Sequence, residues 1–126
     1  MIPLSFGQHR LWVLDQLDGP NPTYNVPLAQ RFHGALDRAA LQHALDDVVG
    51  RHESLRTLIA VTDGAPHQKI QPAAQAHVPL DLVELDTDLE DSGNETPAPA
   101  ARLASSLQRF AELPFVLATD LPVRAC

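Results

Sequence analysis

The first apolar positions of the chain recur with the spacing of one helical face. They are Phe6, Leu11, Val13, Leu14 and Leu17. Ser5 and Gln8 stand three residues apart where this pattern begins, which is the signature of a capping box. Gly19 and Pro20 follow the last apolar position, and both residues favour a helix end. The pattern predicts a helix over residues 6–18.

A second helical pattern begins after Asp37, which can cap the helix, while Leu36 and Leu41 form a hydrophobic staple. We expect its buried side to carry Leu41, Ala44, Leu45, Val48 and Val49. We expect its solvated side to carry Asp37, Arg38, Gln42, Asp46 and Asp47. Arg51 and His52 lie near its C-terminal end, where positive charge interacts favourably with the helix dipole.

A third helical pattern lies near the end of the chain. Its apolar positions are Leu103, Leu107 and Phe110. It predicts a helix over residues 100–113, which Pro114 ends. Residues 86–99, before this helix, are acidic and rich in Ser, Gly, Asn and Pro, so we interpret them as an exposed loop.

Between the helices the pattern shifts to the period of two that is typical of strands. The expected strands are residues 26–32, 57–62 and 67–70, a short strand within residues 78–85, and the opening of a strand over residues 121–126. The residues between the second and third of them, Asp63-Gly64-Ala65-Pro66, predict a β-hairpin. Helices and strands in this order indicate an α/β fold. Because the last strand has only begun when the chain stops, which would leave backbone groups unpaired, we expect a truncated domain.

Composition narrows the class of function. The chain has 126 residues, with 9 Lys+Arg against 16 Asp+Glu, and a formal net charge of −7. This charge argues against binding to nucleic acid or to an anionic membrane, since both need a basic surface. We find no apolar run long enough for a bilayer and no signal peptide, and Cys126 as the one cysteine excludes an internal disulfide. We therefore expect a small cytoplasmic domain.

Familiar catalytic and metal-binding motifs do not occur in the sequence, which has no Gly-rich phosphate loop, no G-x-S-x-G and no H-E-x-x-H. His43 and Asp47 stand four apart on the second helix, but such a pair is usually solvated. Ser5 and Ser54 have no visible base, and capping or turn roles explain both. The acidic residues within 86–91 lack the spacing of a calcium loop. We expect neither a metal site nor a catalytic residue.

Two segments hold more polar and aromatic residues than their helices require. The first is residues 5–14, with the sequence SFGQHRLWVL. A capped amphipathic helix explains its serine, glutamine and leucines, but not the single Trp close to an Arg. The second is residues 51–57, with the sequence RHESLRT, which is dense in polar groups just where the chain enters a strand.

These segments resemble the first two core motifs of condensation domains from nonribosomal peptide synthetases. The first family motif reads S-x-A-Q-x-R-[LM]-[WY]-x-L, and residues 5–14 match it with Gly7 in place of Ala. The second reads R-H-E-x-L-R-T-x-F, and residues 51–59 match it with Ile59 in place of Phe. The stretches Tyr24-Asn25-Val26-Pro27 and Gly34-Ala35-Leu36-Asp37 are similar to the family as well. The similarity extends over essentially the whole chain.

The resemblance implies a large α/β enzyme domain of two lobes similar to chloramphenicol acetyltransferase, each with helices packed on a mixed sheet, and an active site between the lobes. Donor and acceptor peptidyl carrier domains deliver substrates as phosphopantetheine thioesters, and the acceptor's amine attacks the donor's thioester to form an amide. Tethering both reactants makes this step effectively unimolecular. The implied partners are the two carrier domains and the remaining synthetase domains. Phosphopantetheine belongs to the carriers, and this chain is expected to bind no cofactor.

One motif of the family is missing. No two histidines are adjacent in the sequence, so the active-site motif His-His-x-x-x-Asp-Gly does not occur. In family members it follows one strand beyond a segment that resembles residues 121–126. We therefore expect residues 1–126 to be the N-terminal part of a condensation domain, without the second lobe, and to be inactive alone.

The family roles that the resemblance carries over are supporting ones. Arg56 corresponds to the arginine that pairs with the Asp of the active-site motif, a bidentate pair that lysine would not reproduce. Arg51, His52 and Glu53 are expected to form a polar network around Arg56, with His52 as a scaffold residue rather than the catalytic base. The first-motif residues expected to build the first helix and the inner wall of the lobe are Ser5, Gln8, Arg10 and Trp12.

The wording of the motifs is most similar to the condensation subtype that joins two L-configured residues. Two other interpretations stay open. One is a non-catalytic remnant that binds a carrier domain or another chain, and a monodisperse, cooperatively unfolding monomer would favour it. The other is a related acyltransferase with an alcohol acceptor, which only sequence beyond these residues would distinguish.

Overall fold

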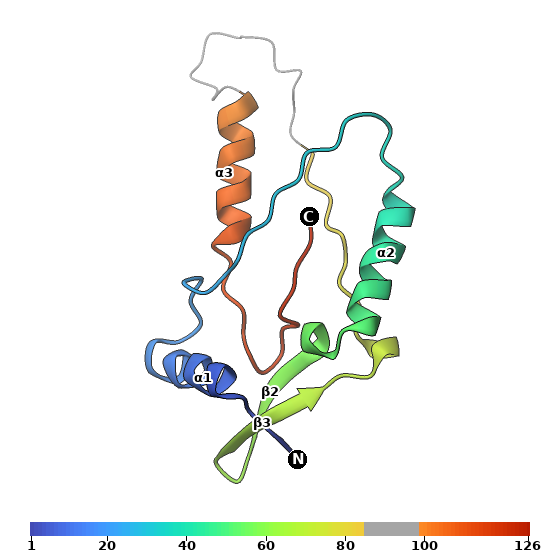
Figure 1. The fold of residues 1–126 in the computed structure, drawn as a ribbon. Coiled ribbons are helices and arrows are strands. Elements are labelled where there is room, and N and C mark those ends of the chain that lie inside the picture. Colours follow the sequence, from blue (N-terminus) through green and yellow to red (C-terminus); the bar gives the residue numbers. More distant parts are fainter. Residues whose placement is uncertain (85–98) are drawn as a thin grey trace.

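The structure, a computed structural model, describes residues 1–84 and 99–126. Its elements are β1 (Ile2–Pro3), α1 (Phe6–Asp18), α2 (Arg38–Arg51), the 3₁₀ turn η1 (Glu53–Arg56), β2 (Thr57–Thr62), β3 (Ala65–Ile70), the 3₁₀ turn η2 (Ala73–Gln75) and α3 (Pro99–Ala111). The combination of helices and sheet confirms the expected α/β class. The β2–β3 hairpin projects at one end of the molecule beside α1, and the C-terminal segment runs between α2 and α3 (Figure 1).

Helix α1 begins and ends where the sequence predicts. Ser5 N donates to Gln8 Oε1 at 2.8 Å and Gln8 N donates to Ser5 Oγ at 3.2 Å, so the capping box is complete. Gly19 ends the helix with φ of +76°, and its N–H donates to Asp15 O at 2.9 Å. Phe6 at the first position is fully exposed, so the apolar face is not covered at its start.

Helix α2 also has its predicted cap, since Asp37 Oδ1 accepts a hydrogen bond from Ala40 N at 3.0 Å. Its buried face is only partly as expected. Val49 is fully buried, but Ala44 is exposed and Val48 is 46% exposed. The buried side is therefore rotated about the helix axis relative to the expected stripe.

Two polar residues of α2 that were expected in solvent explain this rotation. Gln42 and Asp46 are half-buried because they face the chain that follows η2. Gln42 Nε2 donates to Val78 O at 2.9 Å, and Leu80 N donates to Gln42 Oε1 at 2.7 Å. Asp46 Oδ1 lies 2.9 Å from His77 Nδ1. The Gln42 side chain thus makes the two hydrogen bonds to Val78 and Leu80 that the backbone of a neighbouring strand would otherwise make.

The predicted hairpin is confirmed. β2 and β3 pair antiparallel from Thr57–Ile70 to Thr62–Ala65. The two-residue turn has positive φ at both positions, 50° at Asp63 and 77° at Gly64, as a type I′ turn requires. β3 begins two residues earlier than expected. On its other side β3 pairs with β1, an edge strand too short to leave a sequence pattern.

The strand predicted over residues 26–32 is wrong. Those residues are extended but belong to no strand, and Val26 and Leu28 are 93% and 84% exposed. The alternation of apolar side chains is present, but none of the described residues pairs with this backbone, and a strand exists only when its ladder is made.

The strands predicted over residues 78–85 and 121–126 are reduced, in the described part of the chain, to one parallel bridge. It joins Leu80 and Ala125, and Asp81 N donates to Ala125 O at 3.0 Å. The third helix is confirmed as α3, one residue longer at its start and two shorter at its end than expected. The loop predicted over residues 86–99 lies outside the described residues, except that Pro99 begins α3.

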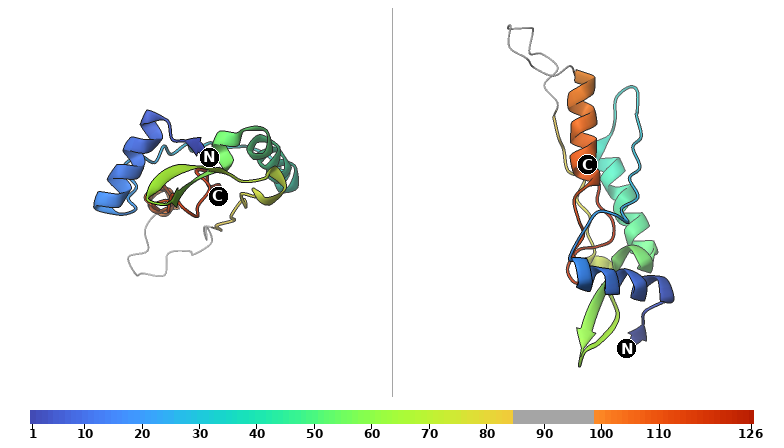
Figure 2. Two further views of the ribbon diagram at one scale, coloured as in Figure 1. Left: turned by 90° about the horizontal axis from the view of Figure 1, so that it is seen from below. Right: turned by 90° about the vertical axis from the view of Figure 1, so that its left-hand side faces the viewer.

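The core lies where α2, the chain after η2 and the C-terminal segment meet. Val49, Ala76 and Val78 form its buried cluster. Leu45, Leu55, Leu121, Val123 and Ala125 pack against it. The two further views show the C-terminal segment running past α2 and α3 (Figure 2), and Cys126 itself is exposed. This core fixes η1, which connects α2 to β2 and carries the second sequence motif.

Candidate functional site

Arg56 is the last residue of η1, and its side chain is only 12% exposed. Its Nη1 donates to Gln71 O at 2.6 Å. Gln71 N in turn donates to the Arg56 carbonyl at 2.8 Å, so side chain and backbone hold the same neighbour just beyond β3. The start of β2 and the end of β3 therefore fix the guanidinium.

The other edge of this guanidinium is almost unused. Arg56 Nη2 lies 3.5 Å from Glu53 Oε1, and the Glu53 side chain is 63% exposed, so this ion pair contributes little. Arg56 Nε is buried and has no hydrogen-bond partner among the described residues. Nε and Nη2 share one side of the planar group, the side that can take a carboxylate through two parallel hydrogen bonds. The site can thus bind an anionic oxygen pair.

The other predicted members of this polar group are arranged unequally. Glu53 contacts Arg56, and its carbonyl accepts a hydrogen bond from Thr57 Oγ1 at 2.6 Å. Arg51 and His52 are exposed, and their side chains make no hydrogen bond with the described residues. His52 contributes backbone groups instead, since its N–H donates to Val48 O and its carbonyl accepts from Leu55 N. Of the three residues expected around Arg56, Glu53 is thus the one whose side chain contacts it within the described chain.

The first-motif residues divide between capping and packing. Ser5 and Gln8 form the capping box of α1, while Arg10 is exposed. Trp12 is half-buried, and its ring centroid lies 5.9 Å from that of His9. Trp12 also lines a groove of about 310 Å³ between α1 and β2. The other residues that line this groove are Asp15, Gln16, Ile59, Ala60, Val61, Lys69, Leu117 and Ala118. Trp12 of the first sequence motif and Ile59 at the end of the second motif therefore line the same groove.

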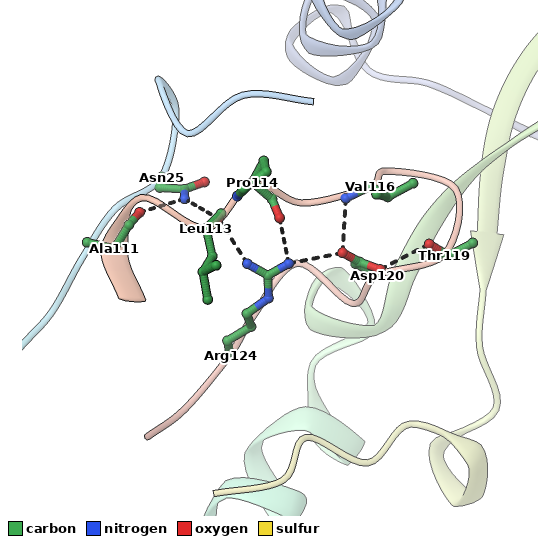
Figure 3. A network of polar contacts seen from close by, with 8 residues as sticks. All are labelled: Asn25, Ala111, Leu113, Pro114, Val116, Thr119, Asp120 and Arg124. Atoms are coloured by element: carbon green, nitrogen blue, oxygen red, sulfur yellow. Dashed lines mark hydrogen bonds and ion pairs between the residues drawn. The ribbon is translucent and has the colours of Figure 1, made fainter. Parts of the chain in front are cut away.

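A second polar cluster, which the sequence analysis missed, surrounds the loop of residues 113–120 (Figure 3). Asn25 Nδ2 donates to Ala111 O at 2.8 Å and to Leu113 O at 2.9 Å, which satisfies carbonyls at the end of α3. Arg124 Nη1 donates to the same Leu113 carbonyl at 2.9 Å. The available signal was Asn25 itself, within a stretch that resembles the family.

Asp120 completes this cluster. Its Oδ2 accepts hydrogen bonds from Val116 N and from Arg124 Nη2, both at 3.0 Å. The pKa of Asp120 lies below its ordinary value of 3.8, mainly because its carboxylate accepts a hydrogen bond from the backbone N–H of Val116. Desolvation raises this pKa and offsets part of the effect, while Thr119 and Arg124 lower it further. These contacts favour the ionised carboxylate and connect Asp120 to Val116 within the loop and to Arg124 beyond it.

The described residues offer no metal centre. Among residues 1–84 and 99–126, no three His, Cys, Asp or Glu side chains are placed to hold a metal ion. The acidic residues within 86–91 lie outside the described residues. None of the helices described is long and apolar enough to cross a membrane.

The described chain is thus an α/β unit in which the Arg56 side chain is largely enclosed and its Nε is buried without a partner among the described residues. A family model for the condensation domain matches residues 1–126. The chain belongs to the condensation domain family of nonribosomal peptide synthetases. This confirms the family that the two sequence motifs indicate.

Individual relatives agree with this assignment. The chain is 46% identical over 123 residues to an isonitrile lipopeptide synthase of Mycobacterium tuberculosis, covering 98% of this chain and 4% of that protein. It is 45% identical over 125 residues to CymA, a probable non-canonical nonribosomal peptide synthetase of Salinispora arenicola. This alignment covers 99% of this chain and 1% of that protein. The chain therefore spans only a small part of these relatives.

A solved structure shares the fold. The first condensation domain of the CDA synthetase matches 92% of this chain and 29% of its own chain, with a TM-score of 0.52 and 23% identity. The corresponding fold is therefore larger than the part that these residues cover.

Proposed function

We propose that this chain is part of a condensation domain that forms an amide bond between two carrier-tethered aminoacyl or peptidyl thioesters, in the subtype that joins L-residues. The match of the condensation domain model to residues 1–126 supports the condensation reaction, and the wording of the two sequence motifs supports the subtype. The partners are donor and acceptor peptidyl carrier domains, whose phosphopantetheine arms hold the substrates, in a cytoplasmic synthetase. The chain itself holds no cofactor.

In this reaction the acceptor amine nitrogen forms a bond to the donor thioester carbon, the carbon–sulfur bond breaks, and the amine proton ends on the released thiol. Catalysis relies on placing two tethered reactants together, which replaces a bimolecular encounter. The residues of this chain contribute a frame. We assign no acid–base step to His52, which is exposed and offers only backbone groups to η1.

Arg56 is the residue through which this frame supports the active site. We propose that its Nε and Nη2 take the carboxylate of the Asp in the His-His-x-x-x-Asp-Gly motif, which the sequence of these residues lacks. The proposal is supported by the burial of Nε without a partner among the described residues. A carboxylate there would satisfy this donor and balance the charge, and it would hold the active-site loop against η1.

The experiment is a single-turnover assay with the full-length protein that carries these residues and two carrier domains, each loaded with an L-aminoacyl group. We expect a carrier-bound dipeptide amide by mass spectrometry, and none from residues 1–126 alone. Transfer to an alcohol acceptor but not to an amine would contradict the proposal. Amide formation by residues 1–126 alone would contradict their supporting role.

A further inference from the structure

Arg124 holds the 113–120 loop from a single position. Its Nη1 donates to Leu113 O at 2.9 Å, and its Nη2 donates to Pro114 O at 2.6 Å and to Asp120 Oδ2 at 3.0 Å. Its guanidinium carbon lies 3.9 Å from the centroid of the Phe115 ring. Figure 3 shows the guanidinium between the two ends of the loop. The loop cannot shift as a unit without breaking several of these contacts.

The same loop is attached to β2. Ile59 N donates to Leu117 O at 2.8 Å, outside the pairing of β2 with β3. Leu117 and Ala118 also form one wall of the groove that Trp12 lines from α1. The loop position therefore sets both the outer edge of β2 and the width of this groove.

A third support comes from the segment after α1. Asn25 Nδ2 donates to Ala111 O and to Leu113 O, so the Leu113 carbonyl accepts from Asn25 and Arg124 together. Two residues 99 positions apart in the sequence thus meet on one backbone oxygen. This arrangement fixes the start of the loop, and Arg124 fixes its end through Asp120.

We propose that Arg124 is a positioning residue for amide formation, acting through the 113–120 loop on β2 and hence on Arg56, three residues before Ile59. The inference rests on the proposed function. Arg124 does not touch the reacting groups. It keeps Leu117 against Ile59, and the β2 backbone from there back to Thr57 keeps η1 and its arginine in place.

The test uses Arg124→Lys in the full-length protein, because lysine keeps the charge but cannot donate to the three spread acceptors. We expect kcat for amide formation to fall on the order of tenfold or more, as for a small misplacement of reacting groups, with KM for the carriers little changed. Hydrogen exchange at the Ile59 amide should accelerate by a larger factor than exchange at the Val49 amide in α2. Arg109→Lys is the matched control, since Arg109 is exposed and its one side-chain hydrogen bond to the described residues goes to Ser106 Oγ, at 3.3 Å.

Wild-type kcat in Arg124→Lys would overturn the proposal. So would uniform acceleration of exchange at Ile59 and Val49, because that result means a general loss of stability rather than a local displacement. If the wild-type protein forms no amide, the proposed function fails. The Ile59 exchange rate then still decides whether Arg124 positions the loop on β2.

Discussion

Two arginines of this chain use their guanidinium groups in opposite ways. Arg124 is 28% exposed, yet it donates to two carbonyls and a carboxylate of the same chain and lies over an aromatic ring. Arg56 is only 12% exposed, and it makes one hydrogen bond, to Gln71 O, and one loose ion pair. The more buried arginine thus has the fewer partners.

The difference lies in where the N–H donors of each guanidinium find acceptors. A charged group removed from water needs hydrogen-bond acceptors, and a guanidinium has five N–H donors to satisfy. Arg124 finds its acceptors within the described chain. Arg56 Nε does not. We infer that Arg124 belongs to the scaffold, and that the acceptor for Arg56 comes from outside the described residues.

The largest effect is expected from Arg56→Ala in the full-length protein. Removing one partner of a buried pair leaves the other charge uncompensated, so we expect a loss of about 3–5 kcal/mol in the free energy of unfolding, together with loss of amide formation. Denaturant titration and the single-turnover assay measure the two effects. Unchanged turnover and an unchanged unfolding midpoint would refute the role of Arg56.

Arg56→Lys sharpens the same prediction. Lysine keeps the charge but offers a point donor instead of a planar fork, so it should rescue only part of the stability and little of the activity. Full rescue by lysine would show that Arg56 acts by charge alone and forms no bidentate contact.

Arg124→Gln should lower the free energy of unfolding by less than Arg56→Ala does, about 1.5–3 kcal/mol. The acceptors of Arg124 are carbonyls and a carboxylate, which solvent can partly reach once the arginine side chain is gone. Thermal or denaturant unfolding measures this loss. Arg109→Gln, on the exposed side of α3, is the control and should leave stability unchanged. A larger loss at Arg124 than at Arg56 would reverse the comparison between the two arginines.

We expect Asn25→Ala to lower the free energy of unfolding by about 1 kcal/mol, because water can replace part of the hydrogen bonding that the amide donates to Ala111 O and Leu113 O. Gln16→Ala, which removes an exposed side-chain contact at 3.3 Å, is the control. Because Asn25 and Arg124 share the Leu113 carbonyl, the double variant should lose less than the sum of the two single losses. Strict additivity would mean that the two residues support the loop independently.

The smallest effect is a pH dependence at Asp120. Its folded pKa lies below the ordinary value of 3.8, so its contribution to stability is present above that value and is lost as pH falls through the folded pKa. The stability difference between wild type and Asp120→Asn should therefore be constant near neutral pH and shrink only below about pH 4. Urea midpoints at a series of pH values measure it. A difference that shrinks between pH 7 and pH 5 would contradict the assignment.

Local signals explain what the sequence could predict. The capping residues Ser5 and Asp37 mark the starts of α1 and α2, and Asp63-Gly64 specifies the hairpin turn, because each of these features depends on neighbouring residues only. The family likewise followed from two short motifs. The fold class, the bounds of α1 and β2 and the start of α2 could therefore be predicted from the sequence.

Long-range contacts explain what the sequence could not predict. Residues 26–32 alternate like a strand but lack a ladder partner in the described chain, and alternation cannot reveal whether a partner exists. The polarity of Gln42 predicts exposure to solvent, yet its side chain forms hydrogen bonds with Val78 and Leu80. The meeting of Asn25 and Arg124 on Leu113 O depends on a contact between distant residues that no local pattern records.

The most direct test of the account is a double-mutant cycle in the full-length protein. It combines Arg56→Ala with replacement of the Asp of the His-His-x-x-x-Asp-Gly motif by Asn, and measures the free energy of unfolding of all four proteins. We predict that the two changes are strongly non-additive, with a coupling of about 1–3 kcal/mol, because either change alone breaks the same pair. Additive losses would show that Arg56 does not hold this carboxylate, and would contradict the account.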